Sequence, residues 1–520
     1  MSGEYSRAMR GKVLVGSIIV FLLSISSLAG AIGDLRLVEA VKARDKGTVV
    51  SLLKQDADVN VAQPDGATPL QWAAYWDDLE TAGLLIRAGA NVNAPNDYGV
   101  TPLSLACTNG SAAMVETLLK AGANANATLP TGETALMTCA RAGNADAVKS
   151  LLAKGADVKV KETRGGQTAL MWAAAQKRAG VVQVLIEHGA DIHARSDSGF
   201  TPMLFAARVG DVDSTRVLLK AGADVNEATP VQGNSGAAPA YEAAGSAQPA
   251  SSVMTPLLMA SASGHEALSI FLLENGADAN SWDGRAAPLH YAVMKGISYL
   301  HFRPSMPELV KALIAHGANP NVRLVRSAVS GLGGGPGATP FLLAAAAADT
   351  QMMRILLAAG ADPKLATKAN VTPLMAAAGL IRAEAFTQAE QQDALEAVKL
   401  MVELGADVNA ANDAGRTALH GATNMYAEGI IQFLAEHGAN MDAKDKYQQS
   451  PLSIASGIHL PWVPKGDELG EQGSVKQHTV DLLLKLGATP LNTPGYFTPI
   501  DEDSDASRFN PKHEVPGLSK

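Results

Sequence analysis

The sequence predicts an all-α fold, a solenoid of about 11–12 helix-turn-helix units joined by short hairpin fingers. Three repeated features carry this prediction: a Gly-Ala-Asp or Gly-Ala-Asn run, a Thr-Pro-Leu signature about twelve residues later, and a turn between them. Early runs are 33 or 34 residues apart, a period typical of stacked repeats. The runs begin at Gly89, Gly122, Gly155, Gly189, Gly222, Gly276, Gly317, Gly360, Gly405 and Gly438, with a weaker copy at Gly487.

The Thr-Pro-Leu signature predicts where the first helix of each unit begins. In the stretch from Thr68 to Ala74, Pro69 suits the first turn of a helix, where its missing N–H costs nothing. The pair Ala73-Ala74 then makes the helix thin, so that a neighbouring helix can approach closely.

A second apolar run predicts the second helix, which the glycine ends. Between Met114 and Lys120 the apolar residues are spaced for one buried helical face. Gly122 follows, and glycine ends helices in the left-handed conformation. A turn such as Asn96-Asp97-Tyr98-Gly99 then leads to the next unit, which completes the finger.

This unit resembles the ankyrin repeat, whose pattern is Asp-x-x-Gly-x-Thr-Pro-Leu-His-x-Ala-Ala followed by Leu-Leu-x-x-Gly-Ala-Asp-Val-Asn. The resemblance covers roughly residues 35–489 and implies the ankyrin fold, but the same fold serves many partners. In the family, the motif histidine braces the finger. Here it is present in full only at His290 and His420, so we expect most repeats to brace the finger differently.

The N-terminus has the three parts of a secretory signal peptide. Basic residues precede an apolar run at 13–28, and the small residues Ala29-Gly30-Ala31 follow it. The run is shorter than the ~20 residues of a spanning helix, so cleavage after Ala31 is favoured over retention as a membrane anchor. We expect export, to the periplasm first and to the cell exterior second, from a bacterial source.

Composition narrows the function classes. The formal net charge of −9 disfavours nucleic-acid binding, which relies on clustered Lys and Arg. An aromatic fraction of 5% argues against a large cofactor cavity. We expect a monomer that meets the membrane only through its signal segment.

The two cysteines, Cys107 and Cys139, fall on small-residue positions of neighbouring first helices. Because adjacent helices usually stack ~8–10 Å apart, we expect both to pack in the core without a disulfide.

The spacing of the repeat glycines also predicts the domain organisation. After the signal peptide (1–31), residues 32–228 hold an N-terminal cap and regular repeats, and 255–489 hold decorated repeats and a C-terminal cap. Residues 229–254 form a flexible finger insertion and 490–520 an extended or disordered tail. Further loops are predicted at 322–338, in a finger, and between the two helices of a unit at about 297–307, 379–392 and 457–475.

No catalytic, cofactor or metal motif is found. The glycine run at 331–337 lacks the Gly-Lys-Ser/Thr ending of a phosphate-binding loop. The histidines before the capping glycines, His188, His316 and His437, lie in separate repeats. We therefore predict no enzyme activity, no cofactor and no metal.

Partner binding is the function that the resemblance implies, through a concave face of first helices and finger tips. Aromatic and arginine side chains at such positions often anchor interfaces. Tyr75 and Trp76 form the strongest pair, although they could instead pack over neighbouring helices, whereas Trp72 and Trp172 are interpreted as inter-repeat core. The predicted partner-binding residues are Tyr75, Trp76, Tyr98, Arg141, Arg164, Gln176, Phe200, Arg208 and Arg416.

A second candidate surface lies on the inserted loops, which carry Phe302 and Trp462. These rings could also fold back onto the helices beneath. The leading hypothesis is a non-catalytic scaffold that binds another protein. The alternatives are a small-ligand or catalytic accessory site made by the C-terminal insertions, and a secreted effector directed at a host.

Overall fold

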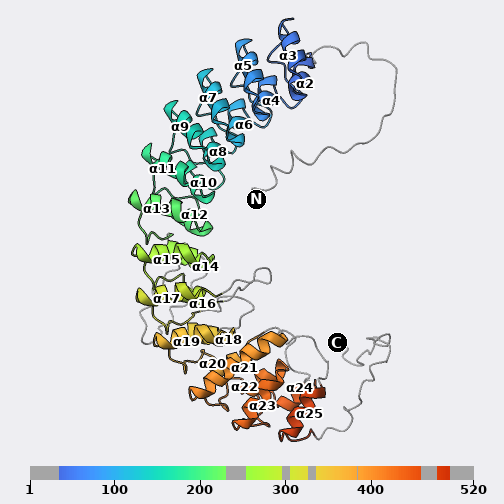
Figure 1. The fold of residues 1–520 in the computed structure, drawn as a ribbon, viewed down its shortest axis with the longest axis vertical. Helices are drawn as coiled ribbons and strands as arrows, with labels where there is room; N and C mark the ends of the chain where they lie inside the picture. Colours follow the sequence, from blue (N-terminus) through green and yellow to red (C-terminus); the bar gives the residue numbers. More distant parts are fainter. Residues whose placement is uncertain are drawn as a thin grey trace, which may run out of the picture. The chain divides into compact units, whose positions relative to one another are not determined.

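The computed structural model describes residues 34–229, 253–294, 305–325, 335–382, 385–457 and 477–491. In these residues 24 helices, α2 to α25, pair into twelve helix-turn-helix repeats (Figure 1), which confirms the predicted all-α solenoid. The described residues contain no strand, only a single bridge between Thr128 and Thr134. The chain divides into an N-terminal module, 1–197, and a C-terminal module, 198–520.

The N-terminal module contains repeats 1 to 5. Their helices pair as α2 (Arg36–Lys42) with α3 (Lys46–Leu53), α4 (Pro69–Tyr75) with α5 (Leu79–Arg87), α6 (Pro102–Asn109) with α7 (Ala112–Lys120), α8 (Ala135–Ala142) with α9 (Ala145–Ala153), and α10 (Ala169–Ala175) with α11 (Ala179–Glu187).

The C-terminal module contains repeats 6 to 12. Their helices pair as α12 (Pro202–Val209) with α13 (Val212–Lys220), α14 (Pro256–Ala262) with α15 (Glu266–Glu274), α16 (Pro288–Val293) with α17 (Pro307–Ala315), α18 (Pro340–Ala346) with α19 (Thr350–Ala358), α20 (Pro373–Ala377) with α21 (Gln388–Glu403), α22 (Ala418–Asn424) with α23 (Glu428–Glu436), and α24 (Pro451–Ala455) with α25 (Gln477–Lys485).

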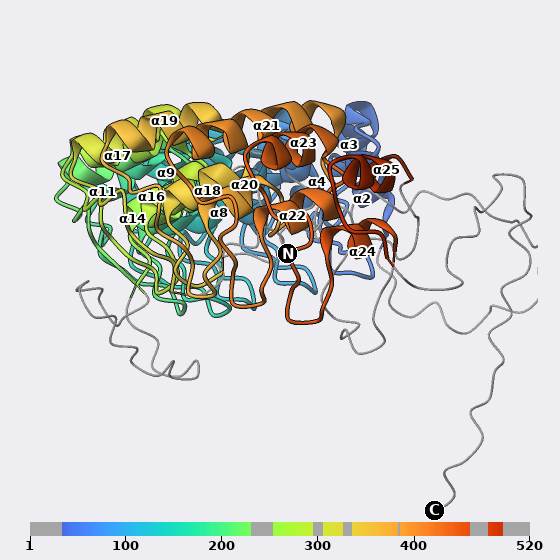
Figure 2. The same ribbon diagram turned by 90° about the horizontal axis from the view of Figure 1, so that it is seen from below.

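Each module has two helical layers. The first helices of the repeats form one layer and the second helices form the other, as Figure 1 shows for α4, α6 and α8 against α5, α7 and α9. Figure 2 shows the fingers of the C-terminal module projecting together beyond the first helices. Small side chains such as Ala73, Ala74 and Ala106 are fully buried between neighbouring first helices, which allows their close approach.

The Thr-Pro-Leu signature begins the first helices, as the sequence predicts. Thr101 is extended (ψ 162°), its side chain accepts a hydrogen bond from the Ser104 N–H, and Pro102 opens the helix. After the second helix, Gly89 has φ +89°, a conformation that side chains disfavour. Threonine and glycine thus mark opposite ends of most helix pairs.

A side chain three residues after the capping threonine braces the following finger. In repeat 2 this residue is Gln71, whose Nε2 donates to the carbonyls of Ala94 (2.9 Å) and Val100 (2.7 Å). In repeat 11 it is His420, whose Nε2 lies 3.2 Å from the Gln449 carbonyl. Glutamine therefore replaces the motif histidine in repeat 2, one of the many repeats expected to brace the finger differently.

An asparagine ladder joins successive fingers. In most repeats the residue four positions after the repeat glycine is an asparagine. Its side chain donates to the carbonyl of the next repeat's glycine and accepts from the N–H two residues after that glycine. For Asn93, the Nδ2 lies 3.1 Å from the Gly122 carbonyl, and the Oδ1 lies 2.7 Å from the Asn124 N. The same double bridge is made by Asn60, Asn126, Asn226, Asn280, Asn321 and Asn409.

Replacing Asn93 with alanine is expected to lower the free energy of unfolding by about 1–2 kcal/mol, because two hydrogen bonds are lost. The stability of Asn93→Asp should lie between those of the wild type and the alanine variant, because aspartate still accepts from the Asn124 N–H but cannot donate to the Gly122 carbonyl. Urea denaturation followed by circular dichroism measures both effects. An alanine variant as stable as the wild type would show that the bridge contributes nothing.

The expectation that Cys107 and Cys139 stay unpaired is wrong. They form a disulfide between α6 and α8, with a Cα–Cα distance of 4.4 Å, and both side chains are fully buried. Each first helix has two consecutive small residues at its centre, Ala106-Cys107 in α6 and Cys139-Ala140 in α8. Cys107 is the second residue of its pair and Cys139 is the first, so the two cysteines lie diagonally opposite each other. The usual ~8–10 Å separates helix axes, and because Cα atoms lie ~2.3 Å from the axis, facing Cα atoms of such helices come close enough for a disulfide.

The prediction of a loop at about 379–392 is wrong for its last residues. Residues 388–392 belong to α21, which has 16 residues where the other second helices have eight or nine. A capping box begins it: Thr387 accepts from the Glu390 N–H and Glu390 accepts from the Thr387 N–H. Phe386 is buried, and the Arg382 guanidinium lies 4.6 Å from the centre of its ring, so the insertion folds onto the helices.

The other predicted insertions, at 229–254, 297–307, 322–338 and 457–475, lie largely outside the described residues. The same holds for the signal segment and most of the tail. Within the described ranges, no helix is long and apolar enough to cross a membrane.

Candidate partner-binding surface

Three aromatic side chains form a continuous stripe on α4. Trp72, Tyr75 and Trp76 are spaced i, i+3 and i+4, so they share one face of the helix. The ring centres of Trp72 and Tyr75 are 5.7 Å apart and those of Tyr75 and Trp76 are 4.8 Å apart, both edge to face. We call these three residues the aromatic ledge.

Two cations from repeat 1 lie over the ledge. The Lys42 Nζ is 5.2 Å from the Trp72 ring centre, and the Arg44 guanidinium is 5.7 Å from the Trp76 ring centre. Both are exposed at the end of α2. The rings therefore help to position positive charge beside an exposed apolar surface.

Hydrogen bonds hold the ledge in place. The Trp72 Nε1 donates to the Gln63 side chain (2.9 Å), and Gln63 donates in turn to Glu39 (2.9 Å). The Asn109 Nδ2 donates to the Tyr75 carbonyl (2.8 Å) from the next repeat. Trp72 is half-buried, so it is only partly part of the inter-repeat core. Trp76 is 39% exposed.

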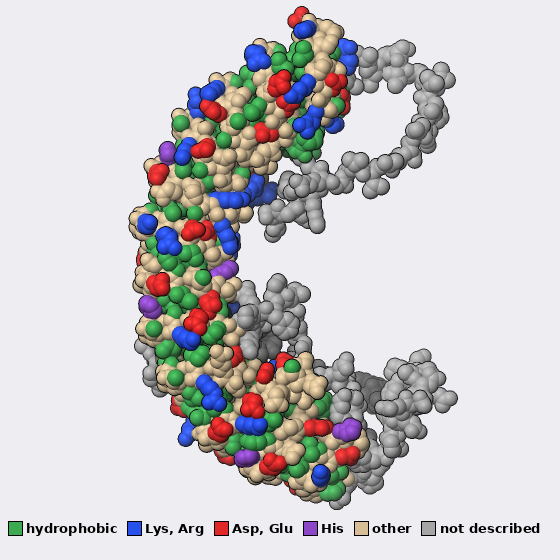
Figure 3. Space-filling view, in the orientation of Figure 1, with side chains coloured by type: hydrophobic (Ala, Val, Ile, Leu, Met, Phe, Trp, Pro, Cys, Tyr) green, Lys and Arg blue, Asp and Glu red, His purple; other side chains and the backbone are tan. Residues whose placement is uncertain are grey.

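A similar pair of side chains recurs in repeats 4 and 5. The Arg141 guanidinium lies 4.9 Å from the centre of the Trp172 ring and pairs with Glu133 at 3.6 Å. Arg141 and Trp172 occupy the same repeat positions as Lys42 and Trp72. Figure 3 shows Lys and Arg side chains, in blue, along the first-helix edge of this module. Gln176 is exposed at the end of α10.

The finger tips present two of the predicted residues to solvent. Tyr98 is 69% exposed, in a turn tied to the preceding finger by a hydrogen bond from the Asp97 N–H to the Asp65 carbonyl (3.0 Å). Arg164 is exposed on a turn built around Glu162, which is 6% exposed and accepts from the Arg164 N–H at 2.6 Å.

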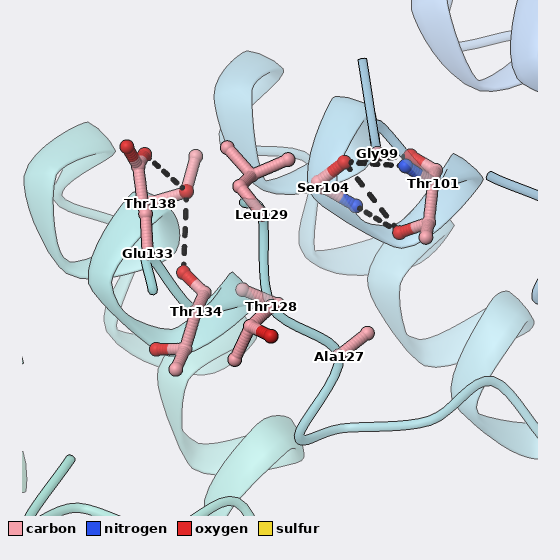
Figure 4. Close-up of a pocket in the computed structure, with 10 residues that line it drawn as sticks. Gly99, Thr101, Ser104, Ala127, Thr128, Leu129, Glu133, Thr134 and Thr138 are labelled. Atoms are coloured by element: carbon pink, nitrogen blue, oxygen red, sulfur yellow. Dashed lines mark hydrogen bonds between the residues drawn. The ribbon is translucent and has the colours of Figure 1, made fainter. Parts of the chain in front are cut away.

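A small hollow lies between two fingers beside Tyr98 (Figure 4). Its cavity volume is about 10 Å³, room for about one water molecule and far below the ~300–1,000 Å³ of ordinary ligand pockets. On one side Thr138 donates to Glu133 (3.0 Å). The hollow is therefore too small for a cofactor. Its lining is Gly99, Thr101, Ser104, Ala127, Thr128, Leu129, Glu133, Thr134, Ala135 and Thr138.

The predicted residues of the C-terminal module have different surroundings. Arg208 is exposed and its guanidinium lies 4.9 Å from the Phe205 ring centre, while Phe200 is half-buried beside the same ring. Arg416 is 17% exposed and forms an ion pair with the buried Asp445 at 3.2 Å, so it supports a finger. Phe302 and Trp462 lie outside the described residues.

Sequence reasoning missed Lys42 and Arg44 as part of the surface. The first repeat has Leu35 where later repeats have the capping threonine, so the signature that sets the repeat position is absent there. In the described ranges, no group of three or more His, Cys, Asp or Glu residues could hold a metal ion.

Family comparisons agree with this architecture. A model of tandem ankyrin repeats matches residues 37–128, 121–196 and 386–460, and a model of the single ankyrin repeat matches 198–230 and 286–323. Together these matches cover more than half of the chain, which therefore belongs to the ankyrin-repeat family.

Among solved structures, the chain is similar to the crystal structure of the human ASB11 ankyrin repeat domain. The identity is 28% and the TM-score 0.34, over 37% of this chain and 86% of that chain. No curated protein matches the sequence.

Proposed function

We propose that this protein is a non-catalytic scaffold that binds another protein through the first-helix and finger face of its N-terminal module. The aromatic ledge carries the proposal. At the equivalent end of the first helix, repeat 3 has only Thr108 and Asn109, and repeat 5 has Ala175 and Gln176. Packing of the repeats therefore does not require two large rings here, whereas a partner interface does use exposed rings flanked by cations.

We further propose that the protein is exported. The N-terminal segment has the composition of a signal peptide. The disulfide between Cys107 and Cys139 supports this proposal, because disulfides persist mainly in oxidising compartments.

Replacing Trp76 and Tyr98 with alanine together is expected to weaken partner capture at least about tenfold, since exposed aromatic anchors contribute ~2 kcal/mol or more. The measurement is quantitative mass spectrometry of proteins retained from the exported fraction by the immobilised chain. Leu79→Ala is the control, because Leu79 is 41% exposed but lies on the second-helix layer.

The two variants give a clear decision. Proteins that Leu79→Ala retains and the double variant loses are partners of the proposed face. If the double variant retains the same proteins in the same amounts, the binding face lies elsewhere and the proposal is wrong.

A further inference from the structure

We infer that an acidic segment of a partner protein docks at the first-helix ends of repeats 4 and 5, on Arg141, Lys177 and Arg178. We call these three residues the cationic edge; Figure 3 shows Lys and Arg side chains gathered beside α8 and α10. This inference rests on the proposed function, because it names the chemistry of the partner for another part of the same face.

The end of α8 holds Arg178 beside Arg141. Gly143 ends α8 with φ +95°, and a Cβ on this glycine would collide with the Cδ and Nε atoms of Arg178. The side chain of Arg178 therefore crosses the helix end, where its Nε donates to the Arg141 carbonyl at 3.4 Å. This contact uses one of the five N–H groups of the guanidinium, so the others can donate to a ligand.

Helix capping does not explain the arginine at position 178. Each residue at the corresponding position of repeats 1 to 4 accepts a hydrogen bond from the first turn of its second helix: Asp45, Asp78, Ser111 and Asn144. Arg178 makes no such bond at the start of α11, and the positive end of the helix dipole repels its charge. A residue that lowers helix stability indicates a role other than packing.

The backbone at Lys177 also suits a residue without charge. Its φ is +58°, and glycine occupies the same position in repeats 3 and 4, at Gly110 and Gly143. Repeat 5 thus has two successive cations where the two preceding repeats have a glycine followed by a neutral cap.

Positive charge exceeds negative charge at the cationic edge. Glu133 pairs with Arg141 at 3.6 Å, and Asp146, at the start of α9, pairs with Lys149 at 3.7 Å. The other two members of the edge are exposed, and neither forms an ion pair with a residue that the structure describes. Two positive charges therefore remain for a ligand.

The other carboxylates of repeats 4 and 5 lie at the finger end of the helices, opposite the cationic edge. Glu162 is buried in a finger turn, where it accepts from the N–H groups of Arg164 (2.6 Å) and Gln167 (2.9 Å). The remaining carboxylates lie at the end of a second helix or in the finger that follows it: Asp157, Glu187, Asp191 and Asp197.

The Trp172 ring orients the third cation. The Arg141 guanidinium lies 4.9 Å from the centre of this ring, and a ring face positions a cation without neutralising it. The contact of Arg141 with Glu133 is long for a charged hydrogen bond, so the guanidinium can still pair with a carboxylate from outside.

An acidic protein segment fits this edge better than other polyanions. Neighbouring first helices lie ~10 Å apart, which matches carboxylates about three residues apart on an extended chain. Nucleic acids and anionic membranes need a larger basic surface, and the formal net charge of −9 repels them elsewhere on the protein.

The test uses a dye-labelled peptide of six Glu-Ala units, with six Lys-Ala units as its opposite, in fluorescence anisotropy titrations of the full chain. We expect the glutamate peptide to bind, with an affinity that falls as salt is added. Arg141→Gln/Arg178→Gln should weaken this binding at least about fivefold, because two charge-assisted contacts are lost. Arg141→Lys/Arg178→Lys should weaken it less, because lysine keeps the charge.

Lys149→Gln/Lys154→Gln is the matched control. It removes the same charge from the second-helix layer of repeat 4, where both lysines are exposed on or directly after α9. This control should change the affinity less than twofold. No binding by the wild type, equal loss in both glutamine variants, or tighter binding of the lysine peptide or of a twelve-nucleotide DNA strand would overturn the inference.

Arg178→Asn separates a binding role from a structural one. Asparagine already caps α9 at the corresponding position, Asn144, so this variant should raise the urea midpoint of unfolding. It should nevertheless weaken binding of the glutamate peptide at least about twofold. Lower stability with unchanged binding would show that Arg178 has a structural role and would overturn the inference.

The capture assay distinguishes failure of this inference from failure of the proposed function. Capture that depends on Trp76 and Tyr98 but not on Arg141 and Arg178 would leave the proposed function standing and refute the acidic partner. Loss of capture in both sets of variants supports both. Capture that neither set of variants changes would refute both.

Discussion

Breaking the disulfide between Cys107 and Cys139 is expected to lower the free energy of unfolding of the N-terminal module by about 3–4 kcal/mol. The bond closes a loop with a sequence separation of 32 residues, and a loop of this size restricts the unfolded chain by about that amount. Urea denaturation with and without a reductant measures the loss. Hydrogen exchange should show it first in α6 to α9, since each repeat is stabilised mainly by its neighbours.

The chain offers a matched control for this experiment. Alanine already occupies the corresponding positions in repeat 2, at Ala73 and Ala74. Cys107→Ala/Cys139→Ala should therefore fold without strain, resemble the reduced wild type in stability, and show no response to a reductant. Native protein in which both thiols react with a thiol reagent after unfolding, without prior reduction, would contradict the disulfide.

His290→Gln is expected to make the C-terminal module more resistant to acid. His290 is fully buried at the start of α16, and burial lowers its pKa to about 4, which the carbonyls of Ala338 and Val322 in the next finger only partly offset. An ordinary histidine has a pKa of about 6.5. Glutamine cannot titrate, and Gln71 already braces a finger from the equivalent position.

The direction of the pH effect follows from these two values. Below pH ~6.5 the unfolded chain binds a proton at residue 290, while the folded chain does not bind it until about pH 4. The wild type therefore loses stability as the pH falls between these values, by about 2 kcal/mol from pH 7 to pH 4.5 at this residue. Over the same pH range His290→Gln should lose less stability than the wild type, and the difference should equal that amount.

Urea denaturation of both proteins at pH 7 and pH 4.5 measures the difference. His437→Gln is the control, because His437 is exposed at the end of α23 and lies outside the finger brace. Equal acid sensitivity of the wild type and His290→Gln would show that His290 is not the titrating group. Burial also lowers the pKa of His420, so that histidine contributes in the same direction.

Local sequence signals predicted the fold well because each repeat marks its own boundaries. The capping threonines and repeat glycines act over a few residues, so Thr101 and Gly122 could be placed without a structure. The disulfide was missed because the ~8–10 Å spacing refers to helix axes, whereas the Cα atoms of residues that face each other across two such helices lie much closer together. The start of α21 was missed because the Thr387–Glu390 capping box lies inside an insertion, where no repeat pattern guided the prediction.

The candidate surface was only partly predictable. Repeat position alone indicated that Trp76 and Tyr98 are exposed. The ion pair of Arg416 depends on Asp445, which lies 29 residues away in the next finger, so its structural role could not be inferred locally. Lys42 and Arg44 belong to an atypical first repeat, and only the packing of α2 beside α4 brings them to the ledge.

The asparagine ladder has a mechanical consequence. Lysine replaces the bridging asparagine at Lys159 in the N-terminal module and at Lys364 in the C-terminal module, and a lysine side chain cannot accept the N–H of the next finger. The fingers on either side of each lysine therefore lack the asparagine double bridge described above. Under a pulling force these two junctions should therefore extend before those that an asparagine bridges, as compliant joints between stiffer blocks.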